Sequence, residues 1–561
     1  MVSDKPFIQR LVKICEVKQV RHIVFSPGSR NAPLVISFDE QEYFNCITIT
    51  DERVAAFYAM GMAQQLQEPV IICCTSGSAA LNYAPAIVEA FYQKIPLLIL
   101  TADRPVERID QGAGQTMRQK NVYSNYIKGS FELIQEAHLI SDLRHNDRLI
   151  CEAINLAKQG AKGPVHINIP LAEPLYGQVK MPSHFDLQLV NVEDTDFPIS
   201  IKSREVIKNL WLRSKKKLIV YGQALPNKDI DILLEKVAQD PSVAVITETC
   251  ANRYINPYNP CIDRLITTIK DEESDLFKPD IVVSLGDAII SKKIKTLMTT
   301  YQPSEHWFVN TQDNAQDTFA CLTKHIKSPA AQFLKLLPQQ ESDSTYGSNW
   351  HNRHLETKIK HNHFLKTCPW SDLLAFETIL GQLPKGSDLQ VSNSSAIRYV
   401  QLFDQRSDLS YYCNRGVSGI DGCSSTAAGA AIASKKITTL VTGDMAFFYD
   451  SNALWNHHLP PNLRIIIINN GGGGIFKIIP GPKKTNQYKQ YFATEQNQSA
   501  EHIAKAFGCE YFAVNDRHAL SKYVDMLFSE TFDKPPILEV FTNEVENEVV
   551  LNRYFAYLKE E

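Results

Sequence analysis

The chain has 561 residues, of which 44% are hydrophobic and 21% charged, and its formal net charge at pH 7 is −4. This composition is that of an ordinary globular protein, and the length exceeds what one hydrophobic core usually serves, so we expect two to four domains. The slight acidic excess disfavours nucleic acid as a partner. The twelve cysteines show no CxxC or CxxH spacing, which fits packing residues in a reducing cytoplasm better than a disulfide framework.

The N-terminal segment predicts a first helix rather than a signal peptide. Charged residues interrupt its apolar positions at helical spacing, and it has no small-residue cleavage site. No apolar run in the chain approaches the length of a membrane span. We therefore expect a cytoplasmic protein without a membrane-spanning segment.

Strand and helix patterns alternate in three sets along the chain. Apolar β-branched runs bounded by Gly, Ser or Pro, each followed by an amphipathic helix, predict mainly parallel sheets covered by helices on both faces. We expect three consecutive α/β domains, at residues 1–185, 201–338 and 365–561, with a polar linker at 187–200. The stretch 338–363 predicts a second linker followed by a solvated helix. The middle set has no GxGxxG, so the sequence gives no reason to assign it a dinucleotide.

Two predicted strands of the third set end in residues suited to a metal. The strand Ile437–Thr442 runs into Gly443-Asp444, and the apolar run Ile465–Ile468 runs into two asparagines and four glycines. Because the carboxyl ends of parallel strands face one crevice, Asp444 and Asn470 should meet although 26 positions separate them. A carboxylate, an amide oxygen and glycine carbonyls suit Mg²⁺, and the glycine run lets a diphosphate approach the backbone.

A Gly-Asp pair, a spacer of about 25 residues and an Asn-Asn pair resemble the metal-diphosphate signature of thiamine-diphosphate (ThDP) enzymes. Met445 stands where many relatives have a second glycine and Gly471 where some have a third asparagine, and neither change removes a proposed ligand. As a pattern alone, the segment also fits a βαβ crossover in which Asp444 caps a helix. The resemblance implies that Asp444, Asn470 and Gly472 hold Mg²⁺, with Mn²⁺ as an alternative. It also implies a cofactor site made of Ile420, Gly443, Asp444, Met445, Asn470, Gly472, Gly473, Ile475 and Phe476, in which Ile420 wedges the cofactor into its bent shape.

The first domain supplies a candidate catalytic acid, Glu52, which opens a helix directly after the strand ending at Thr50. An acidic residue in the first turn ordinarily complements the helix dipole. The resemblance implies a different role, in which Glu52 hydrogen-bonds N1′ of the aminopyrimidine and promotes loss of the C2 proton. In the superfamily this glutamate faces the diphosphate-binding domain of a second subunit. We therefore expect a homodimer, and the sequence leaves open whether dimers pair further.

Five segments together resemble one family, the 2-succinyl-5-enolpyruvyl-6-hydroxy-3-cyclohexene-1-carboxylate synthases of menaquinone biosynthesis. They are SPGSRNAP (26–33), TDERVAAFYAMGMA (50–63), TSGSAALNYAPAIVEAF (75–91), LTADRP (100–105) and NRGVSGIDGCSSTAAG (414–429). In the middle domain the clearest similar piece is LGDAIISKKIK (285–295). The resemblance implies ThDP- and Mg²⁺-dependent condensation of 2-oxoglutarate with isochorismate, with loss of carbon dioxide.

Both substrates carry two carboxylates, so their site should present arginine forks and other donors. The family positions that match are Ser29, Arg30, Arg104, Gln115, Lys292, Lys293, Ser394, Arg398 and Arg415. For any single arginine a surface ion pair is the simpler interpretation, and Arg30 and Arg415 depart from it most clearly because each lies in a turn after a predicted strand.

Two alternatives remain. One is another ThDP enzyme, an oxoacid decarboxylase or an acetohydroxyacid synthase, whose substrates need fewer arginines. The other is a non-catalytic ThDP-binding protein, which the joint presence of Glu52, Asp444 and Asn470 argues against. We do not expect His457 and His458 to bind a metal, because adjacent residues on a helix point apart.

Overall fold

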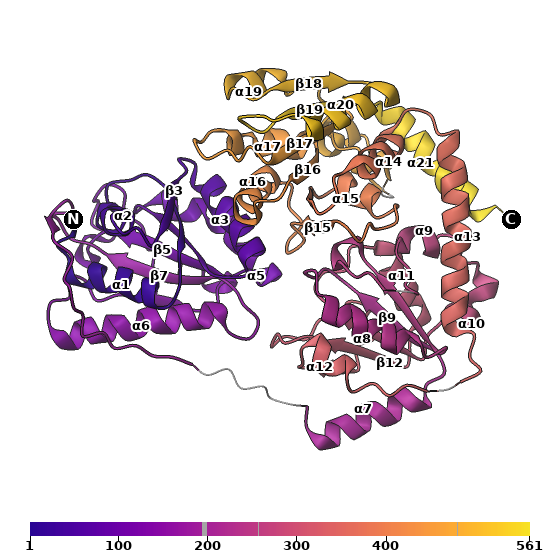
Figure 1. Cartoon of the computed structure of the whole chain (residues 1–561), viewed down its shortest axis with the longest axis horizontal. Helices are drawn as coiled ribbons and strands as arrows, with labels where there is room; N and C mark the ends of the chain where they lie inside the picture. The colour runs from indigo at the N-terminus through magenta and orange to yellow at the C-terminus, as the bar shows by residue number, and fades with distance from the viewer. Residues whose placement is uncertain (193–198, 256, 341, 479–480, 561) are drawn as a thin grey trace.

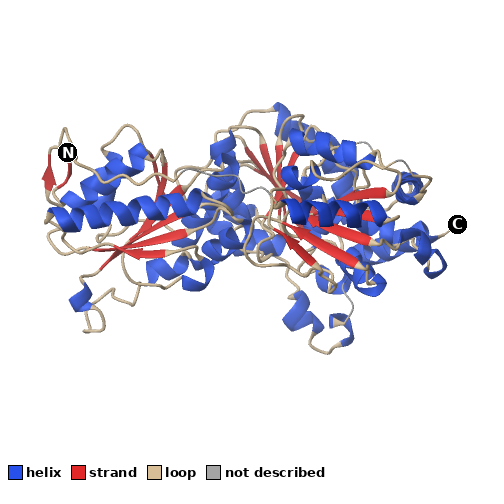
Figure 2. Ribbon diagram, turned by 90° about the horizontal axis from the view of Figure 1, so that it is seen from below, coloured by secondary structure: helices blue, strands red, loops and turns tan. Residues whose placement is uncertain are grey.

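The computed structural model describes residues 1–192, 199–255, 257–340, 342–478 and 481–560 (Figure 1). Three sheets of parallel strands follow one another along the chain, each with helices on both faces (Figure 2). The predicted fold class is therefore confirmed. In the described part of the chain, no helix combines the length and apolar character needed to cross a membrane. Residues 193–198 of the predicted first linker lie outside the described residues.

The first sheet has six parallel strands in the order β3-β2-β4-β5-β7-β6. Its two central strands β4 and β5 are buried along their whole length, as their continuous apolar sequences predict. The strands are β2 (His22–Phe25), β3 (Asn45–Thr48), β4 (Val70–Cys74), β5 (Leu97–Asp103), β6 (Ser130–Glu132) and β7 (Val165–Pro170), and a short antiparallel pair joins β1 (Val2–Ser3) to β8 (Gln178–Val179). The helices are α1 (Pro6–Val17), α2 (Ala32–Asp39), α3 (Glu52–Leu66), α4 (Ser78–Asn82), α5 (Ala84–Gln93) and α6 (Ile140–Lys158).

The last sheet repeats this strand arrangement in the order β15-β14-β16-β17-β19-β18. Its strands are β14 (Asp388–Val391), β15 (Ser410–Cys413), β16 (Thr438–Gly443), β17 (Leu463–Asn469), β18 (Tyr511–Val514) and β19 (Ile537–Phe541). Its helices are α14 (Asp372–Gln382), α15 (Ser395–Val400), α16 (Cys423–Ser434), α17 (Asp444–Tyr449), α18 (Ile475–Ile478), α19 (Glu501–Ala506), α20 (Arg517–Ser529) and α21 (Glu544–Lys559). The chain order reverses between β14 and β16, which is where open α/β sheets bind ligands.

The middle sheet has five parallel strands in the order β10-β9-β11-β12-β13. They are β9 (Lys217–Tyr221), β10 (Val243–Thr247), β11 (Ile281–Leu285), β12 (Glu305–Val309) and β13 (Lys324–Ile326). The helices around it are α7 (Ile201–Arg213), α8 (Lys228–Ala238), α9 (Ile262–Ile266), α10 (Ser274–Phe277), α11 (Lys292–Tyr301) and α12 (Ala330–Leu334). In Figure 1 this domain lies beside the third domain and below it.

Helices α3 and α16 join the first domain to the third (Figure 1). Two glycines allow their backbones to touch. A Cβ atom on Gly61 would lie 2.0 Å from the carbonyl oxygen of Thr426, and one on Gly429 would lie 1.9 Å from that of Tyr58. The alanine-rich sequence of α16 serves the same close approach, so the core of both domains is continuous across this crossing.

The helix predicted to be solvated is instead packed, so that expectation was wrong. Helix α13 (Tyr346–Lys366) buries Trp350 against Phe277 of the middle domain, with ring centroids 5.1 Å apart. Near its other end, His361 is hydrogen-bonded through Nδ1 to the Tyr554 hydroxyl of α21 at 2.8 Å. The polar residues that suggested solvent exposure occupy the other face. The buried residues follow one another at helical spacing, but histidines and a threonine stand among them, so they do not form an obvious apolar stripe.

The two histidines also lie differently from the prediction. Helix α17 ends at Tyr449 and a 3₁₀ helix spans Ser451–Leu454, so His457 and His458 follow these elements in a loop. Nε2 of His458 accepts the backbone N–H of Thr48 at 3.3 Å. Among the described residues no cluster of three or more His, Cys, Asp or Glu side chains could hold a metal.

Candidate functional site

A cavity of about 260 Å³ opens beyond the carboxyl ends of β14, β16 and β17. Strands β16 and β17 are parallel neighbours, with Gly443 paired to Ile468, so Asp444 and Asn470 emerge side by side at this edge. The cavity is lined by Phe376, Asn393, Ser394, Ser395, Ala396, Ile420, Gly443, Asp444, Met445, Ala446, Ile468, Asn470, Gly472, Gly473, Ile475, Phe476, Phe492 and Thr494. The structure thus brings together all nine residues predicted for the cofactor, and Ser394 with them.

Asp444 is the charged group of this cavity and is almost fully buried. Its Oδ1 accepts the backbone N–H of Met445 at 2.8 Å, and its Oδ2 accepts Nε2 of Gln496 at 2.6 Å. Burial raises the pKa of the Asp444 carboxyl to about 6, although these hydrogen bonds lower it. A buried carboxylate of this kind gains most from a bound cation, which would supply the missing countercharge.

Asn470 supplies a second oxygen. Its Nδ2 donates to Oδ2 of Asp372 at 2.9 Å, which turns the amide so that its Oδ1 is the free end. That oxygen is buried and, in the described part of the chain, has no hydrogen-bond partner. An unpaired buried oxygen is costly unless something binds it. Together with Asp444 it offers hard-oxygen ligands, so this donor set fits Mg²⁺ and leaves other coordination positions for phosphate and water.

The backbone of the glycine run and of Ser394 is shaped around the cavity. Gly472 has φ +138°, and a Cβ atom there would lie 2.7 Å from the carbonyl oxygen of Ala493. Ser394, at the start of α15, has φ +72°, which strains a residue with a side chain. Backbone N–H groups and glycine surfaces of this kind can cradle a diphosphate, so the residues present also fit the cofactor that the sequence predicts.

Three residues that hold the cavity together were missed by sequence reasoning. Gln496 bonds to Asp444 across 52 positions of the chain, and Asp372 bonds to Asn470 across 98. Asn393 donates its Nδ2 to the carbonyl oxygens of Asn414 and Gly419, at 2.6 and 2.7 Å. A motif search has no signal for such partners, because each contact depends on the tertiary arrangement.

A group of cations lies where the middle domain meets the third. We call it the cation cluster, and it consists of Lys292, Lys293, Lys295, Arg398 and Arg415. Two buried carboxyls interact electrostatically with it: Glu248 with Arg415, and Asp263 with Lys293 and Arg398. Burial lowers the pKa of Lys293, Lys295 and Arg398, and it raises the pKa of Glu248 to about 7. The structure brings together four predicted substrate residues here, and sequence reasoning missed Lys295.

Arg415 connects the cation cluster to the cavity. Its Nη1 donates to Oδ1 of Asn393 at 3.0 Å, and Asn393 lines the cavity. Its Nε is buried and has no partner among the described residues. The guanidinium therefore has donors left for a ligand beside the predicted cofactor.

The other predicted substrate residues gather in the first domain, in the segments that follow β2 and β5. The backbone N–H of Arg30 donates to Oγ1 of Thr75 at 3.2 Å, and its Nη2 donates to Oε1 of Glu173 at 3.1 Å. Nη1 of Arg104 lies 3.8 Å from the same carboxylate oxygen. The exposed Gln115 accepts the Ser76 hydroxyl on its carbonyl oxygen, and Ser29 is exposed in the turn before α2. Ser29, Arg30, Arg104 and Gln115 are not among the described residues that line the cavity.

Glu52 is the first residue of α3 and is partly buried. Its Oε2 accepts Nδ2 of Asn82 at 3.4 Å, and it too is absent from the described lining of the cavity. Its neighbours contact the third domain of the same chain: Asn452 donates to Oδ2 of Asp51 at 2.9 Å, and Arg53 donates to the carbonyl oxygen of Tyr449 at 2.9 Å. Glu52 therefore lies at a border of the first domain.

Comparison with known proteins agrees with this architecture. Three family profiles match in sequence: "Thiamine pyrophosphate enzyme, N-terminal TPP binding domain" at residues 7–122, "Middle domain of thiamine pyrophosphate" at 198–387, and "Thiamine pyrophosphate enzyme, C-terminal TPP binding domain" at 393–540. The crystal structure of benzoylformate decarboxylase from Polynucleobacter necessarius is similar in fold, with a TM-score of 0.72 over 97% of this chain and 99% of that one. At 16% identity it bears on the fold alone.

The chain has two six-stranded sheets of the same strand order, and Gly443-Asp444 and Asn470-Gly471 lie at the ends of neighbouring strands at one cavity. Together with the matching family profiles, this defines a ThDP-dependent enzyme that transfers a group. Among curated relatives, a synthase from Flavobacterium johnsoniae is 43% identical over 98% of each chain, and one from Flavobacterium psychrophilum is 45% identical over 99% of each. Both are named 2-succinyl-5-enolpyruvyl-6-hydroxy-3-cyclohexene-1-carboxylate synthase. The chain belongs to this family, which confirms the resemblance.

Proposed function

We propose that the protein condenses 2-oxoglutarate with isochorismate, with release of carbon dioxide, to form 2-succinyl-5-enolpyruvyl-6-hydroxy-3-cyclohexene-1-carboxylate in menaquinone biosynthesis. The proposal includes Mg²⁺ between Asp444, Asn470 and the backbone of Gly472, where it would anchor the cofactor's diphosphate. The name shared by the relatives supports the reaction. Isochorismate as acceptor comes from the family resemblance, and the metal is inferred from the donor set of the site.

The observation that carries this proposal is the cation cluster beside the cavity. Substrates with two carboxylates each need several cationic donors, and arginine binds carboxylate with two parallel hydrogen bonds. Arg415 reaches from this cluster to Asn393 on the cavity wall. A site for a small monocarboxylic oxoacid would not need this concentration of positive charge.

When bound, ThDP supplies a cationic thiazolium ring that takes up the electron pair left by the departing carboxylate. The protein's own residues bind, orient and protect the reactants. The apolar side chains of Ile420, Ile475 and Phe476 line the cavity and limit access of water, which would otherwise protonate the reacting carbon. Arg398, Arg415 and the lysines at the start of α11 would hold the substrate carboxylates.

We further propose that Glu52 acts on the cofactor held by a second copy of the chain. The described lining of the cavity runs from Phe376 to Thr494, so the first domain does not contribute to it. Large apolar side chains near Glu52 are about half exposed, among them Leu81 at 49% and Tyr449 at 54%. Exposed apolar groups beside a functional acid suit burial against another subunit. A homodimer with two equivalent sites follows from this arrangement.

The test is a mass-spectrometric assay of purified protein with ThDP, Mg²⁺, isochorismate and 2-oxoglutarate labelled with ¹³C at C1. We expect one labelled carbon dioxide for each isochorismate consumed, and an unlabelled product. Release of labelled carbon dioxide without loss of isochorismate would instead identify an oxoacid decarboxylase. Omitting Mg²⁺ and adding a chelator should abolish the reaction, and activity that persists would exclude the metal.

A further inference from the structure

The loop between β15 and α16, residues 414–422, connects two parts of the site. Arg415 belongs to the cation cluster, and Ile420 lines the cavity. Asn393 of the third domain holds this loop at two points, the carbonyl oxygens of Asn414 and Gly419. The Arg415 side chain is itself bonded to Asn393, and its backbone is placed by whatever holds the middle of the loop between these two points.

The middle of the loop is held by Glu89, a side chain of the first domain. Glu89 lies on α5 and is only 2% exposed. Its Oε1 accepts the backbone N–H of Gly416 at 2.6 Å, and its Oε2 accepts that of Val417 at 2.7 Å. A Cβ atom on Gly416 would lie 2.6 Å from the carbonyl oxygen of Glu89, so the absence of a side chain permits the approach. Hydrogen bonds to a buried carboxylate are strong, and both oxygens are used.

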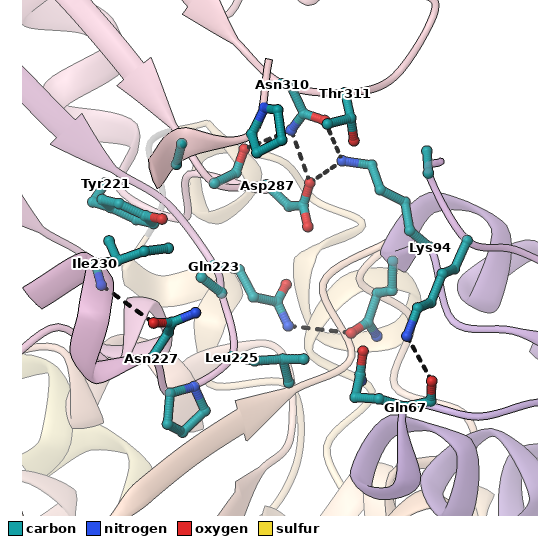
Figure 3. Close-up of a pocket in the computed structure, with 18 of the residues that line it drawn as sticks. Gln67, Lys94, Tyr221, Gln223, Leu225, Asn227, Ile230, Asp287, Asn310 and Thr311 are labelled. Atoms are coloured by element: carbon teal, nitrogen blue, oxygen red, sulfur yellow. Dashed lines mark hydrogen bonds and ion pairs between the residues drawn. The ribbon is translucent and has the colours of Figure 1, made fainter. Parts of the chain in front are cut away.

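Two glutamines link this carboxylate to the middle domain. Nε2 of Gln93 donates to Oε1 of Glu89 at 2.6 Å. Nε2 of Gln223 donates to Oε1 of Gln93 at 3.2 Å and to the carbonyl oxygen of Cys413, directly before the loop, at 2.9 Å. Gln223 and Gln93 lie in the wall of a second cavity, of about 500 Å³, where the three domains meet (Figure 3). In the same wall, Lys94 is hydrogen-bonded to Asn310 at 2.9 Å and paired with Asp287.

We propose that Glu89 is a positioning residue: its carboxylate, oriented by Gln93 and Gln223, clamps the backbone at Gly416 and Val417 and thereby fixes Arg415 for substrate binding. The middle domain then takes part in the reaction through these contacts. The inference deepens the proposed function and rests on it for the role of Arg415, whereas the clamp itself rests on the hydrogen bonds alone.

The experiment compares Glu89→Gln with wild type in two ways. The first is hydrogen exchange, followed by mass spectrometry, of peptides that cover residues 414–422, with ThDP and Mg²⁺ present and no substrate. In Glu89→Gln one N–H would face an amide donor instead of a carboxylate, so exchange should rise roughly tenfold. The second is steady-state kinetics. Because Arg415 is expected to bind 2-oxoglutarate, Arg415→Ala should raise the KM for that substrate. Glu89→Gln should raise the same KM by roughly tenfold, with a smaller change in kcat.

Gln64→Ala is the matched control. Gln64 also lies in the first domain and lines the second cavity, and it accepts Nε2 of Gln390 of the third domain at 2.9 Å. Among the described residues it has no hydrogen bond to residues 414–422. It should leave exchange in 414–422 unchanged. If Glu89→Gln does not fold, Gln93→Leu takes its place, because it removes one bond to Glu89 from a partly exposed position and should shift both readouts in the same direction by less.

The outcomes separate the clamp from the proposed function. Unchanged exchange in Glu89→Gln overturns the clamp. Faster exchange with unchanged KM values, in a protein that is active with both substrates, overturns the positioning role. If exchange is faster in Glu89→Gln but the wild-type protein does not use these substrates, the clamp stands and the proposed function is rejected.

Discussion

At the scale of single residues, the strongest constraint is the pairing of a buried carboxylate with a buried, unpartnered amide oxygen. Asp444→Asn should weaken binding of Mg²⁺ and ThDP by at least about tenfold, because the cation loses its charged protein ligand while the side chain keeps its shape. Calorimetric titration with ThDP and Mg²⁺ measures this. Asp388→Asn is the control, since Asp388 is a buried aspartate of the same sheet that pairs with Lys436 away from the cavity. Unchanged affinity in Asp444→Asn would show that Asp444 is not a ligand.

Arg415 carries a second prediction. Its side chain holds Asn393 and has a buried Nε free in the described part of the chain, so it has donors left for a substrate carboxylate. Arg415→Ala should lower kcat/KM for 2-oxoglutarate more than for a monocarboxylic oxoacid, by about 2–5 kcal/mol if the carboxylate is left buried. Kinetics with the two oxoacids in parallel provide the comparison. Equal losses would remove Arg415 from this role.

The sequence could predict the residues that follow strand ends. Asp444, Asn470 and the glycines stand directly after β16 and β17, and parallel neighbours bring such positions together. The residues that orient them could not be found in this way. Gln496 and Asp372 come from distant parts of the chain and act through single side-chain contacts. Glu89 is similar, because nothing local distinguishes it from any glutamate on an amphipathic helix.

At the scale of elements, the crossing of α3 and α16 should be the most sensitive helix contact. Gly429→Ala would place a Cβ atom 1.9 Å from a backbone oxygen of α3, so the helices must separate. We expect a loss of stability of about 1–3 kcal/mol from this overpacking, measured as a lower midpoint of thermal unfolding. Activity should fall as well, because Glu52 begins α3.

Gly381→Ala is the control for this prediction. Gly381 lies in α14, and a Cβ atom there would meet nothing within 4 Å. Alanine should stabilise that helix by about 0.5–1 kcal/mol. If both variants shifted the midpoint alike, the helix crossing would not be tightly packed.

Whether the burial of a strand or helix could be predicted depended on whether its own sequence showed which faces are covered. The buried strands were evident from continuous apolar runs such as β4, which neighbours must cover on both faces. Helix α13 was misjudged because its buried residues include histidines and a threonine, whose burial comes from partners in two domains. Periodicity alone cannot reveal partners of that kind.

At the scale of the whole molecule, the first and third sheets have the same strand arrangement, and each carries candidate site residues at the edge where its strand order reverses. The cavity that we assign to the cofactor is lined only by residues of the third domain among the described residues, and Glu52 lies at the border of the first. The role proposed for Glu52 therefore requires these two parts to face each other. Asp51 and Arg53 contact the third domain of the same chain. The alternative arrangement is therefore a site formed within one chain rather than between two chains.

Mixing two inactive variants distinguishes these arrangements. Glu52→Gln and Asp444→Asn chains, each with a different affinity tag, are mixed under conditions that allow subunit exchange. In the proposed dimer with twofold symmetry, each homodimer is inactive at both sites, whereas a mixed dimer has one doubly defective site and one intact site. Random pairing makes about half the dimers mixed, so roughly a quarter of wild-type activity should return. Dimers purified through both tags should reach about half of wild-type activity.

The control is a mixture of two differently tagged Glu52→Gln chains, which should stay inactive. If Glu52 and the metal site acted within one chain, every site would keep one defect, and a mixed dimer no more active than its parents would reject the intersubunit site.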